Sequence, residues 1–310
     1  MNKLGKILTY EEFQALQRPK NGRAFFDFVL RILIKIMLFV SFIVMFEHSV
    51  FCSIVIWYLY AVQLSFWGFA GLGHEAYHSK VFSSRATNKL LFLLCSTLTW
   101  NNPRFFSKSH DYHHTNTFAS DDHEAGSESK WSFVDIIGYV LFDTRQFCRR
   151  ICFAIINSTG FYPNLQKLDD NLAVKAARTM VAGNVVIYLS IFLVTESITL
   201  TTLAFIAPFS GSFFTKVLAK AQHHGLCESQ SLGPLKHSRT LNLPGYVCFF
   251  YSNMNYHAEH HFAPSIPYYN LPKLHCLLKA KGLVESVDFR DFIRSWWASE
   301  TFANRHRKVY

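Results

Sequence analysis

The chain has 310 residues, of which 50% are hydrophobic, 16% aromatic and only 17% charged. Its formal net charge is +10 at pH 7, but no basic and aromatic motif typical of nucleic-acid-binding modules accompanies it, so a membrane surface or an acidic protein partner explains the charge better. The seven Cys residues form no C-x-x-C pair, which argues against a disulfide framework and favours a reducing compartment.

The apolar residues gather in long blocks separated by polar segments, a pattern typical of membrane proteins rather than soluble globules. We therefore predict an all-α integral membrane protein with four transmembrane helices in two hairpins and a cytoplasmic, histidine-rich helical cap. No signal peptide is apparent. The expected single domain comprises a basic cytoplasmic N-terminal segment (1–24), a first hairpin (25–72), a cytoplasmic and interfacial region (73–172), a second hairpin (173–217) and the cytoplasmic cap (218–310).

The first hairpin follows a basic segment in which a short interfacial helix is expected near residues 10–16. Residues 25–46 are apolar apart from Asp27, Arg31 and Lys35. A crossing needs about 20 apolar residues, so the first one is expected to begin near Ile32, with Arg31 and Lys35 reaching toward the membrane surface. Residues 47–49 are a short polar turn, and the second apolar run covers 50–72.

The middle of the chain, residues 80–172, contains no clear crossing. Residues 90–100 are apolar but short, so a re-entrant or interfacial piece is expected. Residues 121–124 and 126–130 resemble an exposed loop, and 131–156 is predicted to be one amphipathic helix lying along the membrane.

The second hairpin is expected from two apolar runs, 173–194 and 198–217, around a turn at 195–197. Residues 226–245 are loop-like, and the remainder, with basic residues at 305–308, is polar. The turns at 47–49 and 195–197 contain no Lys or Arg, whereas most basic residues lie in the other segments. The positive-inside rule therefore predicts that the latter segments face the cytoplasm.

Histidines recur at spacings that place them on one face of a helix. His74 and His78 are four residues apart, and the spacing H-x-x-H-H occurs twice. A fourth cluster is the doublet that follows Gln222. Clusters of imidazole indicate metal binding. The two triplets are His110, His113 and His114, and His257, His260 and His261; the doublet is His223 and His224.

At least nine of these ten imidazoles are within reach of one centre, which exceeds the four ligands of one structural zinc site and suits two metal ions with open positions. Imidazole alone does not distinguish Zn, Cu, Fe and Ni. The carboxylates Glu75, Asp111 and Glu259 stand next to the histidines. They fit as hydrogen-bond acceptors that fix the ring orientations, although simple solvated helix faces remain the alternative.

The pair His74 and His78 and the two triplets, which we call the three histidine boxes, are interleaved with two apolar hairpins. This arrangement resembles the membrane-bound fatty acid desaturase family over about residues 50–274. The resemblance implies a cytoplasmic non-haem di-iron centre that uses O2 and two external electrons. It implies His223 as the ninth ligand, with His224 as the alternative. From its position one helical turn before His257, Asn253 is a candidate to hold a metal-bound water, with a helix-capping or loop Asn as the alternative. The implied iron ligands are His74, His78, His110, His113, His114, His223, His257, His260 and His261.

The resemblance also implies partners. The chain contains no His-Pro-Gly-Gly haem motif, so electrons are expected from a separate ferredoxin or cytochrome b5-like donor. The expected substrate is a membrane lipid or an acyl chain.

A hydroxylase or other oxygenase of the same superfamily is the first alternative function. A membrane metal carrier is disfavoured because the clusters lie outside the apolar runs, and a soluble all-helical metalloprotein is the remaining alternative.

Overall fold

The computed structural model describes residues 7–78, 80–119, 121, 122, 124, 131–160, 170–226 and 233–306, leaving out the side chains of 170 and 299–306. Within these residues the protein is mostly helical, as predicted, and its strands β1 (Thr240–Asn242) and β2 (Ser286–Asp288) pair in parallel. The predicted loop at 126–130 and the last two residues of the basic run at 305–308 lie outside the described residues.

The chain packs as two compact units made of alternating segments. Pro19–Asp111 and Phe133–Lys216 form what we call the hairpin unit. Met1–Arg18, Tyr112–Ser132 and Val217–Tyr310 form the terminal unit. Helices α6 (Pro103–Thr115) and α11 (Phe213–His223) each begin in the hairpin unit and end in the terminal unit.

The first hairpin of the hairpin unit consists of α2 (Asn21–His48) and α3 (Val50–Ser65), separated at Ser49 as predicted. Ser49 begins α3, because its Oγ accepts a hydrogen bond from the backbone N–H of Cys52 at 3.3 Å. Deeper in the pair, the buried Ser53 Oγ donates to the carbonyl oxygen of Phe42 at 2.8 Å. This bond ties the two helices together without leaving the hydroxyl unsatisfied.

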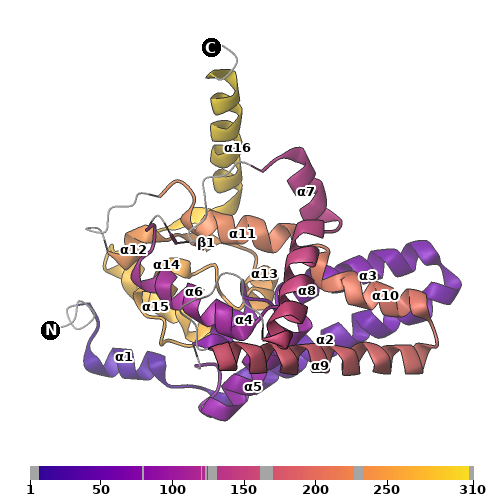
Figure 1. The fold of residues 1–310 in the computed structure, drawn as a ribbon. Helices are drawn as coiled ribbons and strands as arrows, with labels where there is room; N and C mark the ends of the chain where they lie inside the picture. Colours follow the sequence, from indigo (N-terminus) through magenta and orange to yellow (C-terminus); the bar gives the residue numbers. More distant parts are fainter. Residues whose placement is uncertain are drawn as a thin grey trace. The chain divides into compact units, whose positions relative to one another are not determined.

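The second hairpin consists of α9 (Asp170–Thr195) and α10 (Ile198–Ile206), and Ser197 caps α10 as Ser49 caps α3. The expected apolar run 198–217 lies within one candidate crossing, but it is not one continuous α-helix. After Ile206 the chain forms the short 3-10 helix η2 (Ala207–Phe209) before α11 begins. Pro208 lacks a backbone N–H and cannot continue an α-helix. Figure 1 shows α3 and α10 side by side, and the indole N–H of Trp57 donates to the carbonyl oxygen of Leu203 at 2.7 Å.

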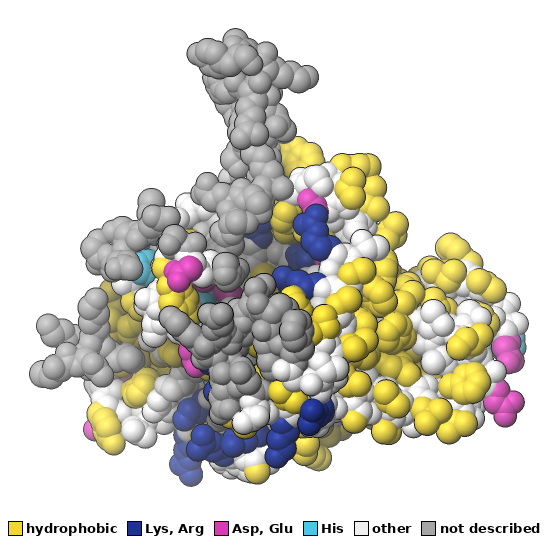
Figure 2. Space-filling model, viewed as in Figure 1, with side chains coloured by type: hydrophobic (Ala, Val, Ile, Leu, Met, Phe, Trp, Pro, Cys, Tyr) yellow, Lys and Arg dark blue, Asp and Glu magenta, His cyan; other side chains and the backbone are white. Residues whose placement is uncertain are grey.

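Three helical stretches are long and apolar enough to cross a membrane by length and composition: Tyr10–His48, Asn171–Thr195 and Ile198–His223. The remaining predicted crossing, α3, is apolar but has only 16 residues. Large apolar side chains point outward from these helices, among them Met37 and Phe51, and Figure 2 shows the apolar cover of the hairpin unit. Such a continuous apolar exterior is typical of surfaces in contact with lipid.

Two further expectations for the hairpin unit need correction. Arg31 and Lys35 do not reach toward the membrane surface, because both side chains are buried within the unit. The predicted single helix over 131–156 is broken into α7 (Phe133–Val140) and α8 (Thr144–Thr159). The break is fixed by Asp143, whose carboxylate accepts from the backbone N–H of Gln146 and so starts α8.

The remaining elements hold the histidines. In the hairpin unit, α4 (Leu72–Tyr77) packs on α5 (Arg85–Leu98), which covers the predicted interfacial piece. The predicted N-terminal helix is present as α1 (Tyr10–Gln17). The other helices of the terminal unit are α12 (Pro234–His237), α13 (Gly245–Phe250), α14 (His257–Phe262), η4 (Tyr268–Asn270), α15 (Leu271–Ala280) and α16 (Phe289–His306).

Candidate metal centre

Four histidines of the terminal unit converge with their ring nitrogens within 4.8 Å of one another. His113 lies in the last turn of α6, His223 ends α11, and His257 and His261 are one turn apart on α14. All four side chains are buried. We call this group the histidine quartet. It brings together one member of the second box, two of the third and one of the doublet.

The chain segment before α14 is held in place by the residue before His223. The side-chain amide of Gln222 donates to the hydroxyl of Tyr251 at 2.8 Å and to the carbonyl oxygen of Met254 at 2.9 Å. Between these two acceptors, Ser252 adopts a positive φ of 55°, so the chain turns sharply before α14. The end of α11 and the start of α14 are therefore fixed against each other, which brings His223 to His257.

The Nε2 atoms of the quartet form a continuous chain of short contacts. His223 Nε2 lies 2.9 Å from His257 Nε2, and His257 Nε2 lies 3.0 Å from His261 Nε2. His261 Nε2 in turn lies 3.2 Å from His113 Nε2. Ordinary packing of four buried rings does not require all four of these nitrogens to face inward.

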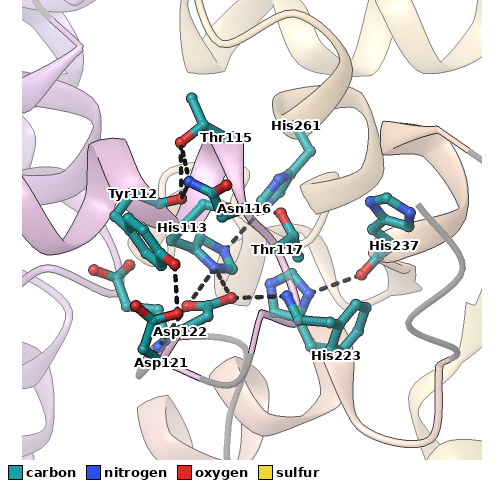
Figure 3. Close-up of polar contacts among 12 residues, drawn as sticks. Tyr112, His113, Thr115, Asn116, Thr117, Asp121, Asp122, His223, His237 and His261 are labelled. Atoms are coloured by element: carbon teal, nitrogen blue, oxygen red, sulfur yellow. Dashed lines mark hydrogen bonds and ion pairs between the residues drawn. The ribbon is translucent and has the colours of Figure 1, made fainter.

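The two outer rings of this chain have their protons fixed by neighbouring acceptors (Figure 3). Nδ1 of His113 lies 2.9 Å from the carboxylate of Asp122, and Nδ1 of His223 lies 2.8 Å from the carbonyl oxygen of His237. Both partners can only accept hydrogen bonds, so Nδ1 must carry the proton in each ring. In the neutral rings, Nε2 of His113 and Nε2 of His223 therefore each present a lone pair.

No distribution of protons on neutral rings satisfies all three contacts. To donate to His113 and His223, both His261 and His257 would need a proton on Nε2, and those two protons would then meet at the 3.0 Å contact. Every other arrangement leaves two lone pairs facing each other. A cation at the centre resolves the conflict, because it accepts a lone pair from each of the four nitrogens.

The spacing also suits a single metal ion. Ligand nitrogens at about 2.1 Å from an ion are about 3.0 Å apart in an octahedral arrangement and about 3.4 Å apart in a tetrahedral one. The three measured contacts of 2.9, 3.0 and 3.2 Å fall close to this range. The quartet therefore fits a metal both in its donor chemistry and in its spacing.

Asp122 was expected in an exposed loop, but its side chain is only 1% exposed. Besides His113, its carboxylate accepts from the backbone N–H groups of Phe118 and Glu124, each at 3.0 Å. Burial raises the pKa of Asp122, but the hydrogen bond and charge of His113 and these N–H groups outweigh it and hold the pKa well below its usual value. Asp122 is thus an anion that orients a metal-facing ring.

The hairpin unit contains a separate group of three histidines, His74, His78 and His110. Nε2 of His78 lies 3.1 Å from Nε2 of His110, and the ring centroids of His74 and His110 are 4.3 Å apart. Phe106 stacks on His110 with an interplanar angle of 13°. Burial lowers the pKa of His78 to about 4, so the imidazole is neutral at pH 7, as metal binding requires.

The two remaining box histidines form a pair in the terminal unit. Nε2 of His260 lies 3.2 Å from Nε2 of His114, and the His114 ring stacks on His261 with centroids 4.4 Å apart. The pair is therefore adjacent to the histidine quartet. His260 is fully buried.

The three carboxylates next to the boxes have different contacts. Glu259 binds Nδ1 of His275 at 2.6 Å and the hydroxyl of Thr240 at 2.5 Å, so it links α14 to α15 and β1 rather than orienting a box histidine. The other two lie in the hairpin unit. Asp111 accepts from the hydroxyl of Tyr77, and Glu75 lies 3.5 Å from Nδ1 of His74.

Two other predicted residues lie apart from the quartet. His224 turns its ring toward Phe292 and Trp296, so of the doublet only His223 joins the quartet. Asn253 is not in a helix with His257; it has a positive φ of 52°, and its amide donates to the carbonyl oxygen of Tyr268 at 3.0 Å. This contact matches the loop alternative for Asn253.

Sequence reasoning missed Asp122 and Gln222, which hold the quartet from outside. The Gln-His pair at 222–223 was the available signal for Gln222, whereas Asp122 stood in a run of acidic residues that looked solvated.

In comparisons with known proteins, a family model described as "Fatty acid desaturase" matches residues 49–283. The comparison with curated proteins gave no match.

Proposed function

Because the chain belongs to the fatty acid desaturase family, we propose that it is a membrane-bound non-haem di-iron desaturase. It uses O2 and two external electrons to introduce a C=C bond into a fatty-acyl or lipid-like chain. The histidine quartet carries this proposal, since four inward-facing Nε2 atoms, two of them with fixed lone pairs, need a cation between them. The family match supports iron as that cation.

In this proposal the quartet holds one iron. The expected ligands that then remain for the second iron are His74, His78, His110, His114 and His260. Helix α6 supports this division, because it carries His110 and His114 one turn apart on the same face. All nine histidines expected from the sequence are then iron ligands, and His224 is not.

When bound, the two irons supply the oxidising power that removes hydrogen from an unactivated carbon chain with O2 as oxidant. The residues of this chain hold and shield that centre. Asp122 and the carbonyl oxygen of His237 keep Nε2 of His113 and His223 unprotonated and aimed at the metal. The burial of all four quartet side chains excludes water from the ligands.

The surroundings of the hairpin unit support a lipid substrate. The three apolar helical stretches and the family match support a membrane protein, and we propose that α3 is a fourth crossing. Two hairpins then return the chain to the side on which it started, so that all histidine boxes face one compartment. The positive-inside pattern supports the cytoplasm as that compartment.

A separate acidic ferredoxin or cytochrome b5-like protein delivers the electrons to the cytoplasmic side of the protein, where the basic residues are expected.

The reaction type is tested by the product. Cells producing the protein are compared with cells producing His261→Ala, and their lipids are analysed by mass spectrometry. We expect an acyl product lighter by two hydrogens, formed only with O2 and only by the wild type. A product heavier by one oxygen would instead assign hydroxylation. A product that persists in the His261→Ala cells would overturn the site.

A further inference from the structure

Helix α2 carries three charged side chains on its buried face. Asp27 is 1% exposed, Arg31 1% and Lys35 7%, and their spacing of four residues places them in one row. The outward face of the same helix is apolar, with Leu33 57% and Met37 59% exposed. Ionisable side chains inside a membrane segment are costly, and they commonly mark a functional site.

Two hydrogen-bond donors at this face lack acceptors. The ammonium of Lys35 lies over the ring of Trp67, 4.6 Å from its centroid, and Trp67 is 1% exposed. Among the residues that the structure describes, neither Lys35 Nζ nor Trp67 Nε1 has a hydrogen-bond partner. A buried donor without an acceptor costs free energy, and a buried ammonium costs more. The group that completes this region must therefore accept hydrogen bonds.

The charges on the buried face of α2 indicate the sign and the amount of charge on the group that accepts these hydrogen bonds. The carboxylate of Asp27 is engaged by Arg23 at 3.1 Å, and two helical turns, or about 12 Å, separate Asp27 from Lys35 along α2. Because Asp27 is already paired with Arg23, it does not neutralise Lys35, whose ammonium places one positive charge beside Trp67. A carboxylate neutralises that charge, whereas a phosphate monoester brings about −1.5 to −2 at pH 7.

The donor pair lies close to the first histidine box. The backbone N–H of Leu72, the first residue of α4, donates to the carbonyl oxygen of Phe66 at 3.1 Å. A Cβ on Gly73 would lie only 3.0 Å from the carbonyl oxygen of Trp67. Gly73 directly precedes His74. The region of Lys35 and Trp67 is therefore joined directly to the start of α4.

We propose that Lys35 and Trp67 bind the carboxylate of an unesterified long-chain acid, which names the substrate class and rests on the proposed desaturase function. The ammonium supplies the opposite charge, and the indole N–H supplies a directed donor. The apolar surface around them, which includes Phe28 with its ring centroid 6.0 Å from Trp67, receives the hydrocarbon chain. A bound carboxylate gives the buried ammonium a partner of opposite charge, and charge-assisted hydrogen bonds are stronger than neutral ones.

The proposal is tested by binding palmitate, its methyl ester and lysophosphatidic acid to the purified full-length protein in neutral-lipid nanodiscs. We expect wild type to prefer palmitate over both other probes. Lys35→Met should weaken palmitate binding by about tenfold or more while leaving the methyl ester unchanged. Lys35→Arg should restore most of the affinity. Lys89→Met, at an exposed lysine of α5, is the matched control and should bind like wild type.

The variant Trp67→Phe provides a second test that does not depend on Lys35→Met folding correctly. Trp67→Phe removes only the indole N–H and keeps an aromatic ring beneath the ammonium, so we expect a smaller loss, about threefold to tenfold, for palmitate alone. Equal losses for acid and ester, or unchanged palmitate binding in both variants, would overturn the carboxylate site. Preferred binding of lysophosphatidic acid would also overturn it. Binding does not require turnover, so an absence of desaturated product would count against the proposed function alone.

Discussion

Asp122 accepts a hydrogen bond from Nδ1 of His113 at 2.9 Å, and this contact determines which nitrogen of His113 faces the histidine quartet. With the proton fixed on Nδ1, Nε2 presents a lone pair toward His261. The geometry that suits the quartet to a metal ion therefore extends beyond its four rings. Its outer supports come from chain segments that no histidine motif includes.

The first prediction concerns Asp122. In Asp122→Ala the His113 ring loses its acceptor and two backbone N–H groups lose theirs, so we expect iron affinity to fall about 10- to 100-fold. Iron retention after dialysis against a graded chelator measures the change. Asp121→Ala is the control, since Asp121 accepts from the exposed hydroxyl of Tyr112 and does not touch the quartet. Equal iron retention in both variants would remove Asp122 from its orienting role.

The second prediction separates the two histidines of the doublet. His223 faces His257 at 2.9 Å, whereas His224 contacts Phe292 and Trp296. We expect His223→Ala to lose about half of the bound iron and His224→Ala to keep all of it, measured by elemental analysis of the purified proteins. The opposite result would exchange the two assignments.

The third prediction concerns the buried pair of Glu259 and His275, whose atoms Oε1 and Nδ1 are 2.6 Å apart. His275→Ala leaves the Glu259 carboxylate buried without this partner, so we expect a loss of about 3–5 kcal/mol in stability. Thermal unfolding of the purified protein measures it as a lower Tm. The double variant His275→Ala with Glu259→Gln should recover part of the loss, because the buried charge is removed. No recovery would show that the pair acts only through packing.

The fourth prediction tests the caps of the two hairpins. Ser49 Oγ and Ser197 Oγ each accept a backbone N–H at 3.3 Å, from Cys52 and Leu200. Replacing either serine by Ala should destabilise the protein by about 1 kcal/mol, and replacing it by Gly by only a few tenths. Thermal unfolding ranks the four variants. A larger effect of Gly than of Ala would contradict the capping role.

The hairpins and boxes could be predicted from the sequence because their signals are local. Apolar blocks around 47–49 and 195–197 gave the helix pairs, and the spacing of four residues placed His257 and His261 on one face. The break at Pro208 was missed because the residues on both sides of it are strongly apolar. The hydropathy pattern therefore indicates one continuous apolar run over 198–217, although Pro208 ends the α-helix there.

Other features depend on contacts between distant segments, which a single sequence does not specify. Asp122 follows Asp121 in an acidic run, yet one side chain is buried on His113 and the other bonds an exposed tyrosine. The sequence likewise does not determine which way the side chains of Arg31 and Lys35 point, since a basic residue in an apolar helix can extend to the membrane surface or turn inward. Only the packing of α2 decides between the two.

Iron analysis of the purified protein, combined with X-ray absorption at the iron edge, determines whether imidazole nitrogens hold two irons. We predict two irons per chain, coordinated mainly by imidazole nitrogens at about 2.1 Å, a typical metal–imidazole distance. A chain that holds zinc instead of iron, or irons surrounded mainly by carboxylate oxygen, would contradict this prediction.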